Sequence, residues 1–396
     1  MSSSPLHILV IHGAYQHRGG EDSVVDSEIE LLKAHGHRVS VMMRSNDEVQ
    51  SLSRLQLLGK TFWARDSAEQ LLRACEEPSR VDVIHAHNTF PLISPSVYWA
   101  AARRRIPVVQ TLHNFRLLCP QAMFLREGKV CEDCLGQVPW RGAVRGCYRD
   151  SRAASSALAG MLTLHRAIGT WQHKVTRYIA LNEFCRRKFV EGGLPASRVV
   201  VKPNFVEFDG PAPSGAREGL LYVGRLSQEK GIDALVGALA RLPEGCLRVA
   251  GAGPLATAFE GLVAPQRMLG NISQISVREE MSRSLALVLP SIWYENFPRT
   301  LVEAFACGLP VIASRLGALA ELVEDGVTGL LVRPSDPADL AEKMQWALQH
   351  PDQMKQMGHN ARRRFESDYG SRRNHELLMR IYADAMAETR AMASIS

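Results

Sequence analysis

Two glutamates stand eight positions apart in the stretch WYENFPRTLVEAFACGLPVI, which runs from Trp293 to Ile312. Glu303 lies among apolar residues, where a carboxylate without a partner is costly to bury. Pro298 is typical of a helix start, which leaves Glu295 in the preceding loop and places Glu303 about a turn and a half into the helix. Both carboxylates could then accept hydrogen bonds from one ligand that carries hydroxyl groups. The alternative is that Glu303 points outward into water.

A second pattern places two cations after a strand end. In YVGRLSQEKGID a strand is predicted to end at Gly224, and Arg225 and Lys230 follow before a helix. An arginine fork and a lysine point charge suit a diphosphate, and a helix N-terminus adds positive potential. The loop therefore indicates a diphosphate site, with two solvated surface cations as the alternative.

Three glycines stand where the backbone could approach a ligand closely. Gly19 and Gly20 precede a predicted helix, and adjacent glycines let amide groups come near a phosphate or a sugar. Gly253 lies in VAGAGPLA, which matches a dinucleotide-binding pattern, but no acidic residue follows about 20 positions later. We interpret this stretch as a tight turn against a ligand and not as a nicotinamide dinucleotide site.

Four cysteines fall in one segment with the spacing C-x11-C-x2-C-x12-C, and they are Cys119, Cys131, Cys134 and Cys147. This spacing suits a tetrahedral zinc ion held by thiolates. A metal would also fold a segment that has little apolar core of its own. The sequence thus predicts a structural zinc, with free or redox-active thiols as the alternative.

The remaining pattern alternates buried strands with helices, which predicts two doubly wound α/β sheets. A length of 396 residues suits two domains, and the joint is predicted within residues 199–219, which hold three prolines and three glycines. We expect an N-terminal Rossmann-like domain over residues 1–200 with a Cys-rich insertion at about 115–150. A C-terminal Rossmann-like domain is expected over 201–370, followed by a helical segment over 371–396.

The charge is unevenly placed along the chain. Residues 101–200 hold 17 Lys and Arg against 6 Asp and Glu, although the whole chain carries a net charge of only +6. Such a basic region predicts an anionic partner, for example a membrane surface, and a solvated basic face is the alternative. No nucleic-acid-binding motif accompanies it, so no nucleic acid is expected. No apolar run reaches the length of a membrane span, and no basic segment precedes the first apolar run, so we expect a cytoplasmic protein.

Taken together, these motifs resemble the retaining, nucleotide-sugar-dependent glycosyltransferases of family four, which have the GT-B fold. The E-x7-E stretch ENFPRTLVE carries the strongest resemblance, and RGGEDSVV, TLHN, KPNFVE, GRLSQEKGID and ELVEDGVTGLLV resemble other motifs of the family in the same order. The resemblance covers nearly the whole chain. It implies two Rossmann-like domains that face a cleft, with the C-terminal helix crossing back to pack on the N-terminal domain.

The resemblance also implies a role for each candidate residue. Glu295 would contact the donor sugar, with His113 beside the reacting carbon, and these two form the implied catalytic set. Glu303 would bind the ribose hydroxyls. The other implied donor-binding residues are Gly19, Gly20, Arg225, Lys230, Gly253, Asn296 and Phe297. Pro298 stands where many members have glycine.

The implied reaction moves a sugar from a UDP or GDP sugar to a hydroxyl acceptor with retained configuration. No metal cofactor would be required for catalysis. Together with the basic region, the resemblance suggests a glycan or lipid-linked glycan acceptor in bacterial polysaccharide or glycolipid assembly, at the inner face of the cell membrane. A sugar-nucleotide epimerase of the same fold and a non-catalytic sugar-binding protein are the alternatives. The nucleobase, the sugar, the acceptor, the linkage and the oligomeric state are not specified by the sequence.

Overall fold

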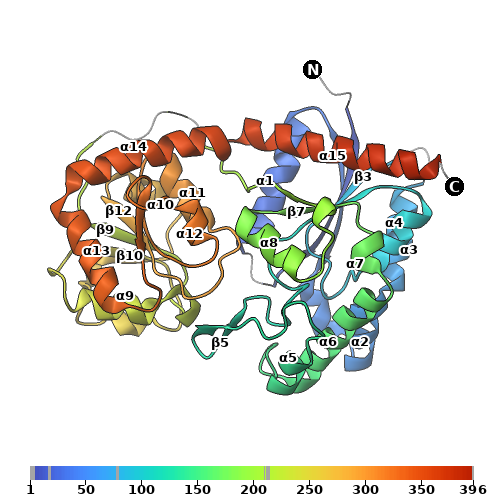
Figure 1. The fold of residues 1–396 in the computed structure, drawn as a ribbon, viewed down its shortest axis with the longest axis horizontal. Coiled ribbons are helices and arrows are strands. Elements are labelled where there is room, and N and C mark those ends of the chain that lie inside the picture. The colour runs from blue at the N-terminus through green and yellow to red at the C-terminus, as the bar shows by residue number, and fades with distance from the viewer. Residues whose placement is uncertain (1–4, 17–18, 77–79, 209, 211–214, 395–396) are drawn as a thin grey trace. The chain divides into compact units, whose positions relative to one another are not determined.

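The computed structural model describes residues 5–16, 19–76, 80–208, 210 and 215–394 of the chain. They divide into two compact units (Figure 1). Unit 1 comprises Met1–Ala122, Glu132–Pro203 and Asn374–Ser396, and unit 2 comprises Met123–Cys131 and Asn204–Arg373.

Unit 1 is built on a six-stranded parallel sheet with the order β2-β1-β3-β4-β7-β8. Its strands are β1 (His7–Ala14), β2 (Arg38–Ser45), β3 (Val83–Ala86), β4 (Val108–Thr111), β7 (Arg177–Ala180) and β8 (Val199–Val201). The chain reverses its direction across the sheet between β1 and β3. In open parallel sheets, ligands bind at the carboxyl ends of the strands at such a switch point.

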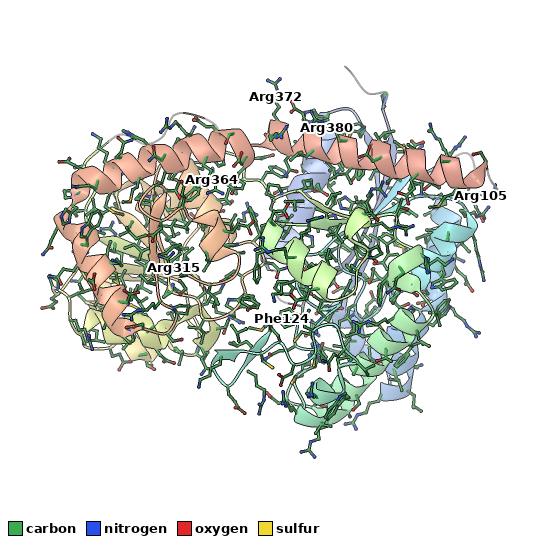
Figure 2. All side chains as sticks on the ribbon, in the orientation of Figure 1. Arg105, Phe124, Arg315, Arg364, Arg372 and Arg380 are labelled. Atoms are coloured by element: carbon green, nitrogen blue, oxygen red, sulfur yellow. The ribbon has the colours of Figure 1, made fainter. Side chains whose placement is uncertain are left out.

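Helices cover both faces of this sheet. They are α1 (Gly20–Ala34), η1 (Asn46–Ser51), α2 (Arg54–Trp63), α3 (Arg65–Ala74), α4 (Ser96–Arg103), α5 (Trp140–Arg145), α6 (Arg152–Ala167), α7 (Thr170–His173), α8 (Glu183–Glu191), η2 (Ala196–Arg198) and α15 (Ser371–Ala393). The last helix, α15, shares a buried apolar cluster with β1, to which Leu378 and Tyr382 contribute from the helix. Exposed arginines such as Arg105 and Arg380 lie at the periphery of the unit (Figure 2).

Unit 2 contains a second six-stranded parallel sheet with the order β11-β10-β9-β12-β13-β14. The strands are β9 (Leu220–Val223), β10 (Leu247–Ala250), β11 (Met268–Gly270), β12 (Ala286–Leu289), β13 (Val311–Ser314) and β14 (Gly329–Val332). This is the Rossmann strand order, with its switch point between β9 and β12. The helices are η3 (Gln228–Lys230), α9 (Ile232–Leu239), η4 (Ala256–Phe259), η5 (Pro265–Arg267), α10 (Gln274–Ser282), α11 (Arg299–Ala306), α12 (Leu319–Leu322), α13 (Pro337–Gln349) and α14 (Pro351–Asp368).

One part of the Cys-rich insertion differs from the sequence expectation. Residues 123–131, which hold the short hairpin of β5 (Leu125–Arg126) and β6 (Lys129–Val130), group with unit 2 and not with the N-terminal domain. The physical reason is the side chain of Phe124, which is fully buried and packs edge-on against Tyr294 with 6.1 Å between the ring centroids. This assignment corrects the prediction that placed the whole insertion in the N-terminal domain.

Apart from the hairpin over residues 123–131, the chain passes between the units near Pro203 and again near Asn374, and the two passages are hydrogen-bonded to each other within unit 1 and within unit 2. In unit 1, the Asn374 amide donates a hydrogen bond of 2.6 Å to the Pro203 carbonyl. In unit 2, the Val206 amide donates one of 3.3 Å to the Tyr369 carbonyl. The two connecting segments therefore run side by side.

Among the described residues, no helix is both long enough and apolar enough to cross a bilayer.

Candidate active site

The loop after β9 is held against the segment that follows β12. Gly231 adopts the left-handed conformation, and a Cβ atom there would lie 1.9 Å from the Pro290 carbonyl oxygen, so no other residue fits. The Ile292 amide also donates a hydrogen bond of 3.0 Å to the Glu229 carbonyl. These contacts bring the loop holding Arg225 and Lys230 next to the loop holding Glu295, at the switch point of unit 2.

Lys230 and Glu295 form an ion pair in this position. The distance between Lys230 Nζ and Glu295 Oε1 is 2.6 Å, and the Ser291 hydroxyl donates a hydrogen bond of 2.8 Å to the same oxygen. Glu295 is 7% exposed, so its interactions are shielded from water. The Lys230 ammonium also lies 5.3 Å from the centre of the Trp293 ring. The structure thus brings together two residues that the sequence analysis had assigned to different parts of one ligand.

Arg225 lies at the start of the same loop, with a side chain that is 65% exposed. Its guanidinium donates to the Ser227 hydroxyl at 3.1 Å and pairs with the Glu229 carboxylate. Burial opposes the ionisation of Glu229, but hydrogen bonds from Ser227 and Arg225 outweigh it and lower the pKa of this carboxyl. Glu229 was not predicted as part of the site, although the spacing Ser-x-Glu in the loop is a signal for a local hydrogen bond.

Glu303 is buried on α11 and is 7% exposed, so the alternative of a solvated helix residue does not hold. Its Oε1 atom accepts hydrogen bonds of 3.1 Å from Arg299 Nε and from Gln274 Nε2. Pro298 is the N-cap of α11, which begins at Arg299, one residue later than the sequence predicted. The role of Glu303 in ribose binding stays a prediction.

Close contact between backbone segments explains why glycine is required at two positions after β10. A Cβ atom at Gly253 would lie 2.3 Å from the Leu226 carbonyl oxygen, and one at Gly251 would lie 1.9 Å from the Gly224 carbonyl oxygen. The close approach is therefore to the backbone of the Arg225 loop, and the role of Gly253 in donor binding stays a prediction. Of the two other predicted donor residues, Asn296 is buried, and Phe297 packs edge-on against Tyr369 at 5.9 Å.

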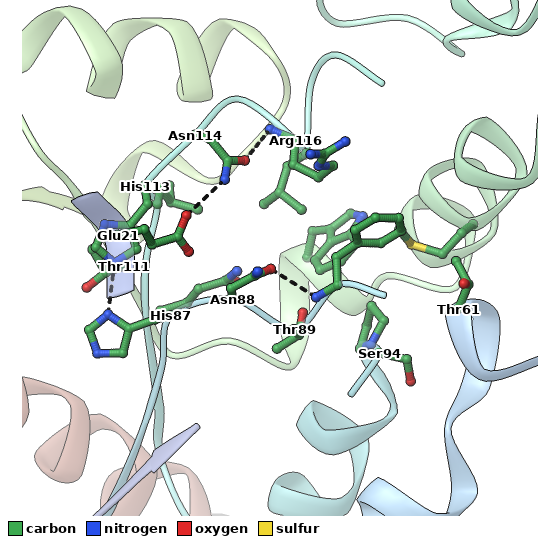
Figure 3. Close-up of a pocket in the computed structure, with 17 residues that line it drawn as sticks. Glu21, Thr61, His87, Asn88, Thr89, Ser94, Thr111, His113, Asn114 and Arg116 are labelled. Atoms are coloured by element: carbon green, nitrogen blue, oxygen red, sulfur yellow. Dashed lines mark hydrogen bonds between the residues drawn. The ribbon is translucent and has the colours of Figure 1, made fainter. Parts of the chain in front are cut away.

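The predicted catalytic and donor-binding residues of unit 1 follow β1 and β4. A pocket here is lined by His113, Glu21 and Asn88, among others (Figure 3). The Glu21 carboxylate accepts hydrogen bonds of 3.3 Å from the Asn114 amide and 2.9 Å from the Tyr15 hydroxyl. Burial raises the pKa of the Glu21 carboxyl to about 7, against the opposing effect of these donors.

Gly19 and Gly20 begin α1 next to this pocket. Gly19 is the N-cap, and its amide donates a hydrogen bond of 2.8 Å to Asp22, whose other oxygen lies 2.9 Å from His12 Nε2. A Cβ atom at Gly20 would meet no atom within 4 Å. The space beside the helix start is open, and ligand binding by both glycines stays a prediction.

A buried chain of polar side chains contacts His113. His113 Nε2 lies 2.8 Å from His87 Nδ1, and His87 Nε2 lies 3.4 Å from Glu28 Oε1. Glu28 also contacts His85 Nδ1 at 2.9 Å and Lys202 Nζ at 3.0 Å. The sequence analysis overlooked this chain, although the spacing His-x-His at a strand end places both rings on one side of the strand.

The charges of this chain fix the hydrogen-bond direction. Burial opposes ionisation of Glu28, but Lys202 and His85 outweigh it and hold the pKa of the carboxyl well below its usual value. Burial lowers the pKa of His87 to about 4 and that of His113 well below its usual range, so both rings are neutral near pH 7. An anionic Glu28 favours a proton on His87 Nε2. In that tautomer His87 Nδ1 accepts the hydrogen bond from His113 Nε2, while the 3.4 Å contact between His87 Nε2 and Glu28 Oε1 is an electrostatic contact and not a hydrogen bond.

Glu28, His85 and His87 present ligand atoms that lie within 4.8 Å of one another, which is a spacing that a metal ion could use. The Lys202 ammonium, however, is already bonded to Glu28, and a divalent cation would have to displace it. The geometry therefore favours an internal ion pair over a metal centre.

The four cysteines of the predicted zinc site are divided between the units. Cys131 belongs to unit 2, and the other three belong to unit 1. Cys119 and Cys134 are buried, whereas Cys131 and Cys147 are partly buried. The zinc site stays a prediction.

Two Rossmann-like units with charged loops at their switch points are the arrangement of the GT-B fold. Comparison with family models agrees with this class. The "Glycosyl transferase 4-like domain" model matches residues 19–204, and the "Glycosyl transferases group 1" model matches residues 208–364. The chain therefore belongs to the family-four-like GT-B glycosyltransferases, as the resemblance in sequence implied.

Individual proteins share this similarity. A D-inositol 3-phosphate glycosyltransferase of Mycobacterium sp. (strain KMS) is 30% identical over 284 residues, which cover 68% of this chain and 59% of the relative. A glycogen synthase of Mycobacterium tuberculosis is 35% identical over 163 residues, which cover 38% of each protein. The chain thus spans between 38% and 59% of the length of these curated relatives.

Solved structures show the same fold. Anabaena HepE in complex with UDP superposes with a TM-score of 0.66 at 18% identity, covering 96% of this chain and 99% of that protein. Sucrose-phosphate synthase from Thermosynechococcus elongatus gives a TM-score of 0.65 at 21% identity, covering 99% and 100%.

Proposed function

We propose that the protein transfers a sugar from a nucleotide diphosphate sugar to a hydroxyl acceptor with retention of configuration. The observation that carries this proposal is the convergence of Arg225, Lys230 and Glu295 at the switch point of unit 2, where parallel sheets bind nucleotides. UDP is the first nucleotide to test, because HepE has been solved with UDP and with UDP-glucose.

The cationic loop would stabilise the leaving group. When the bond between the anomeric carbon and the phosphate oxygen breaks, negative charge develops on the diphosphate. The exposed guanidinium of Arg225 and the ammonium of Lys230 can both donate to it. Two fixed cations of this kind can do the work that a metal ion does in other transferases, so no catalytic metal is part of the proposal.

The carboxylates would recognise the donor by its hydroxyl groups. We assign Glu295 to the donor sugar and Glu303 to the ribose, as the family resemblance implies. His113 is assigned to the sugar near the reacting carbon. Retention follows if the acceptor oxygen attacks the anomeric carbon from the face that the diphosphate leaves, with the acceptor proton passing to the departing phosphate oxygen. One C–O bond then forms as the other breaks.

The acceptor is proposed to be a glycan or a lipid-linked glycan bound by unit 1, in bacterial polysaccharide or glycolipid assembly. The basic composition of residues 101–200 supports an anionic acceptor, and contact with the inner face of an anionic membrane is part of the proposal. A cytoplasmic location is proposed with it.

The proposal is tested by binding and product analysis. Arg225→Ala and Lys230→Ala should each weaken UDP binding by about one to two decades, because a charge-assisted hydrogen bond contributes about 1.5–3 kcal/mol. Arg241→Ala, at an exposed position after α9, is the matched control and should bind UDP as the parent does. Calorimetry with UDP and GDP measures the effect. If both loop variants bind UDP and GDP as tightly as the parent protein does, the diphosphate assignment is wrong.

Product analysis separates the transferase from a sugar-nucleotide epimerase of the same fold. Incubation of the protein with a UDP-sugar alone should leave the sugar unchanged or slowly hydrolysed. Conversion of the sugar to its epimer would identify an epimerase instead.

A further inference from the structure

Unit 1 contains a groove that the donor chemistry does not use. Helices α2 and α6 are in contact, and a cavity of about 540 Å³ is lined by residues of both helices and of the loops after β2 and β3. Most of its surface is apolar. The apolar residues from α2 are Leu55, Leu57 and Leu58, and those from α6 are Ala153, Ala154, Ala157 and Leu158. Leu55 is 81% exposed and Leu58 is 42% exposed, so part of the apolar lining from α2 is open to solvent.

Three arginines line the same groove. Arg54 begins α2, Arg149 precedes α6, and Arg116 follows β4, whereas no aspartate or glutamate is among the lining residues. Among the described residues, none of the three arginines is in an ion pair with a carboxylate; Arg116 donates at 2.7 Å to the Pro120 carbonyl and lies 5.0 Å from the Phe90 and Tyr148 ring centres. Arg116 interacts electrostatically with Glu21, but Arg54 and Arg149 have no carboxylate at ion-pair distance among the described residues, and guanidinium groups so placed can bind an anion such as a phosphate.

The groove adjoins the pocket that is lined by His113. Thr61, Asn88, Phe90 and Arg116 line both cavities. A ligand whose tail lies between α2 and α6 could therefore extend its head toward His113 past Arg116. A ligand that reaches both cavities must be apolar at one end and polar at the other.

We propose that the groove binds the acceptor as an amphiphile, a hydrocarbon chain joined through a phosphate to a hydroxyl-bearing head. The chain packs against the leucines of α2 and the alanines of α6, and the phosphate is bound by Arg54, Arg149 and Arg116. This inference rests on the proposed glycosyl transfer, since it identifies the class of acceptor. The concave shape favours a single lipid molecule over a flat membrane surface, and the absence of lining carboxylates favours an anionic lipid over a peptide.

Binding of farnesyl phosphate to the full chain, below its aggregation concentration, tests the proposal. Farnesol and inorganic phosphate supply the tail and the anion separately, and both should bind at least about tenfold more weakly than farnesyl phosphate. Ala157→Trp should fill the groove, and the double variant Arg54→Glu, Arg149→Glu should repel the anion. Each should weaken farnesyl phosphate binding by about tenfold or more.

Matched controls keep the volume or charge change but move it to α4 and its C-terminal end. They are Ala102→Trp and the double variant Arg103→Glu, Arg105→Glu, at exposed positions outside the groove, and both should bind farnesyl phosphate like the parent. Equal weakening by the control arginines would point to a non-specific basic surface and would overturn the proposal. So would unchanged binding in the groove variants, or binding to anionic vesicles but not to the single lipid.

UDP binding measured on the same samples separates this inference from the proposed function. All groove variants should bind UDP like the parent. Loss of lipid binding with intact UDP binding supports the groove. Groove-dependent lipid binding without any UDP or GDP binding would support the groove and contradict the donor assignment.

Discussion

Each predicted carboxylate in unit 2 has a cation as its partner. Glu295 is paired with Lys230 at 2.6 Å, and Glu303 is bonded to Arg299 at 3.1 Å. The pairing explains how these carboxylates tolerate burial. It also means that a diphosphate must compete with Glu295 for the Lys230 ammonium, so Glu295 holds the cation in position and at the same time weakens its attraction for an anion.

The two glutamates should therefore have separable effects on binding. Glu303→Gln should weaken binding of UDP and of the UDP-sugar alike, because an unmade buried hydrogen bond costs about 1–3 kcal/mol, which is roughly a 5- to 150-fold loss of affinity. Glu295→Gln should leave UDP binding unchanged or slightly tighter, because Lys230 is released, and should weaken only the sugar-bearing donor and turnover. Calorimetry with both ligands measures the difference. Equal losses of free UDP in both variants would contradict these roles.

The residues that could be predicted were those whose neighbours are close in sequence. Arg225 and Lys230 follow a strand end, and their loop is visible as a local pattern. Glu28 and Lys202 are 174 positions apart, and each alone resembles an ordinary surface charge until the fold brings them to 3.0 Å. The ion pair between Glu28 and Lys202 could not be found from the sequence for this reason, whereas the His-x-His spacing of His85 and His87 was a local signal.

At the scale of elements, regular strands and long helices were the most predictable features. The last helix was expected at the end of the chain and runs over Ser371–Ala393, and the strands of both sheets follow the apolar runs. The Cys-rich segment was not predictable in this way, because it has two strands of two residues each and a helix of only six. Ala122, Phe124 and Glu127 also adopt positive φ angles, which cost of order 1–3 kcal/mol each for residues other than glycine.

A segment with so little regular structure needs another source of stability, and we propose that zinc supplies it. Protein purified under reducing conditions should contain about one equivalent of zinc per chain. Cys131→Ser should lose the metal and make residues 115–150 more susceptible to proteolysis. Cys75→Ser, at a partly buried cysteine at the end of α3, should retain it. Elemental analysis that finds no zinc in the parent protein would refute the site.

At the scale of the whole molecule, one buried ion pair joins three distant parts of the chain. Lys202 lies just before the passage to unit 2 at Pro203, Glu28 belongs to α1, and Asn374 belongs to α15. The Lys202 ammonium is bonded to both the Glu28 carboxylate and the Asn374 side-chain oxygen, each at 3.0 Å. The stability of unit 1 should depend strongly on this cation, because its loss leaves a buried carboxylate unpaired.

Lys202→Met should destabilise the protein by about 3–5 kcal/mol near pH 7, and the double variant with Glu28→Gln should recover part of the loss. The difference in the free energy of unfolding between the parent protein and Lys202→Met should depend on pH. The folded state holds the pKa of Glu28 below its usual value, so this stabilisation is present above about pH 4.3 and is lost as the pH falls toward the folded-state pKa. Chemical denaturation at pH 7 and pH 4 measures it. An equal difference at both pH values would contradict the assignment.

Unit 2 is an insertion in the chain of unit 1, and the two segments that connect the units are hydrogen-bonded to each other. Apart from the hairpin over residues 123–131, the chain leaves unit 1 after Pro203 and returns to it at Asn374. These two residues of unit 1 are hydrogen-bonded at 2.6 Å. Without unit 2, the chain of unit 1 would have a gap that a few residues could close. The two ends of unit 2 could be joined in the same way. Evolution or an engineer could exchange unit 2 as a single inserted domain without lengthening unit 1, or circularly permute the chain between Pro203 and Asn374.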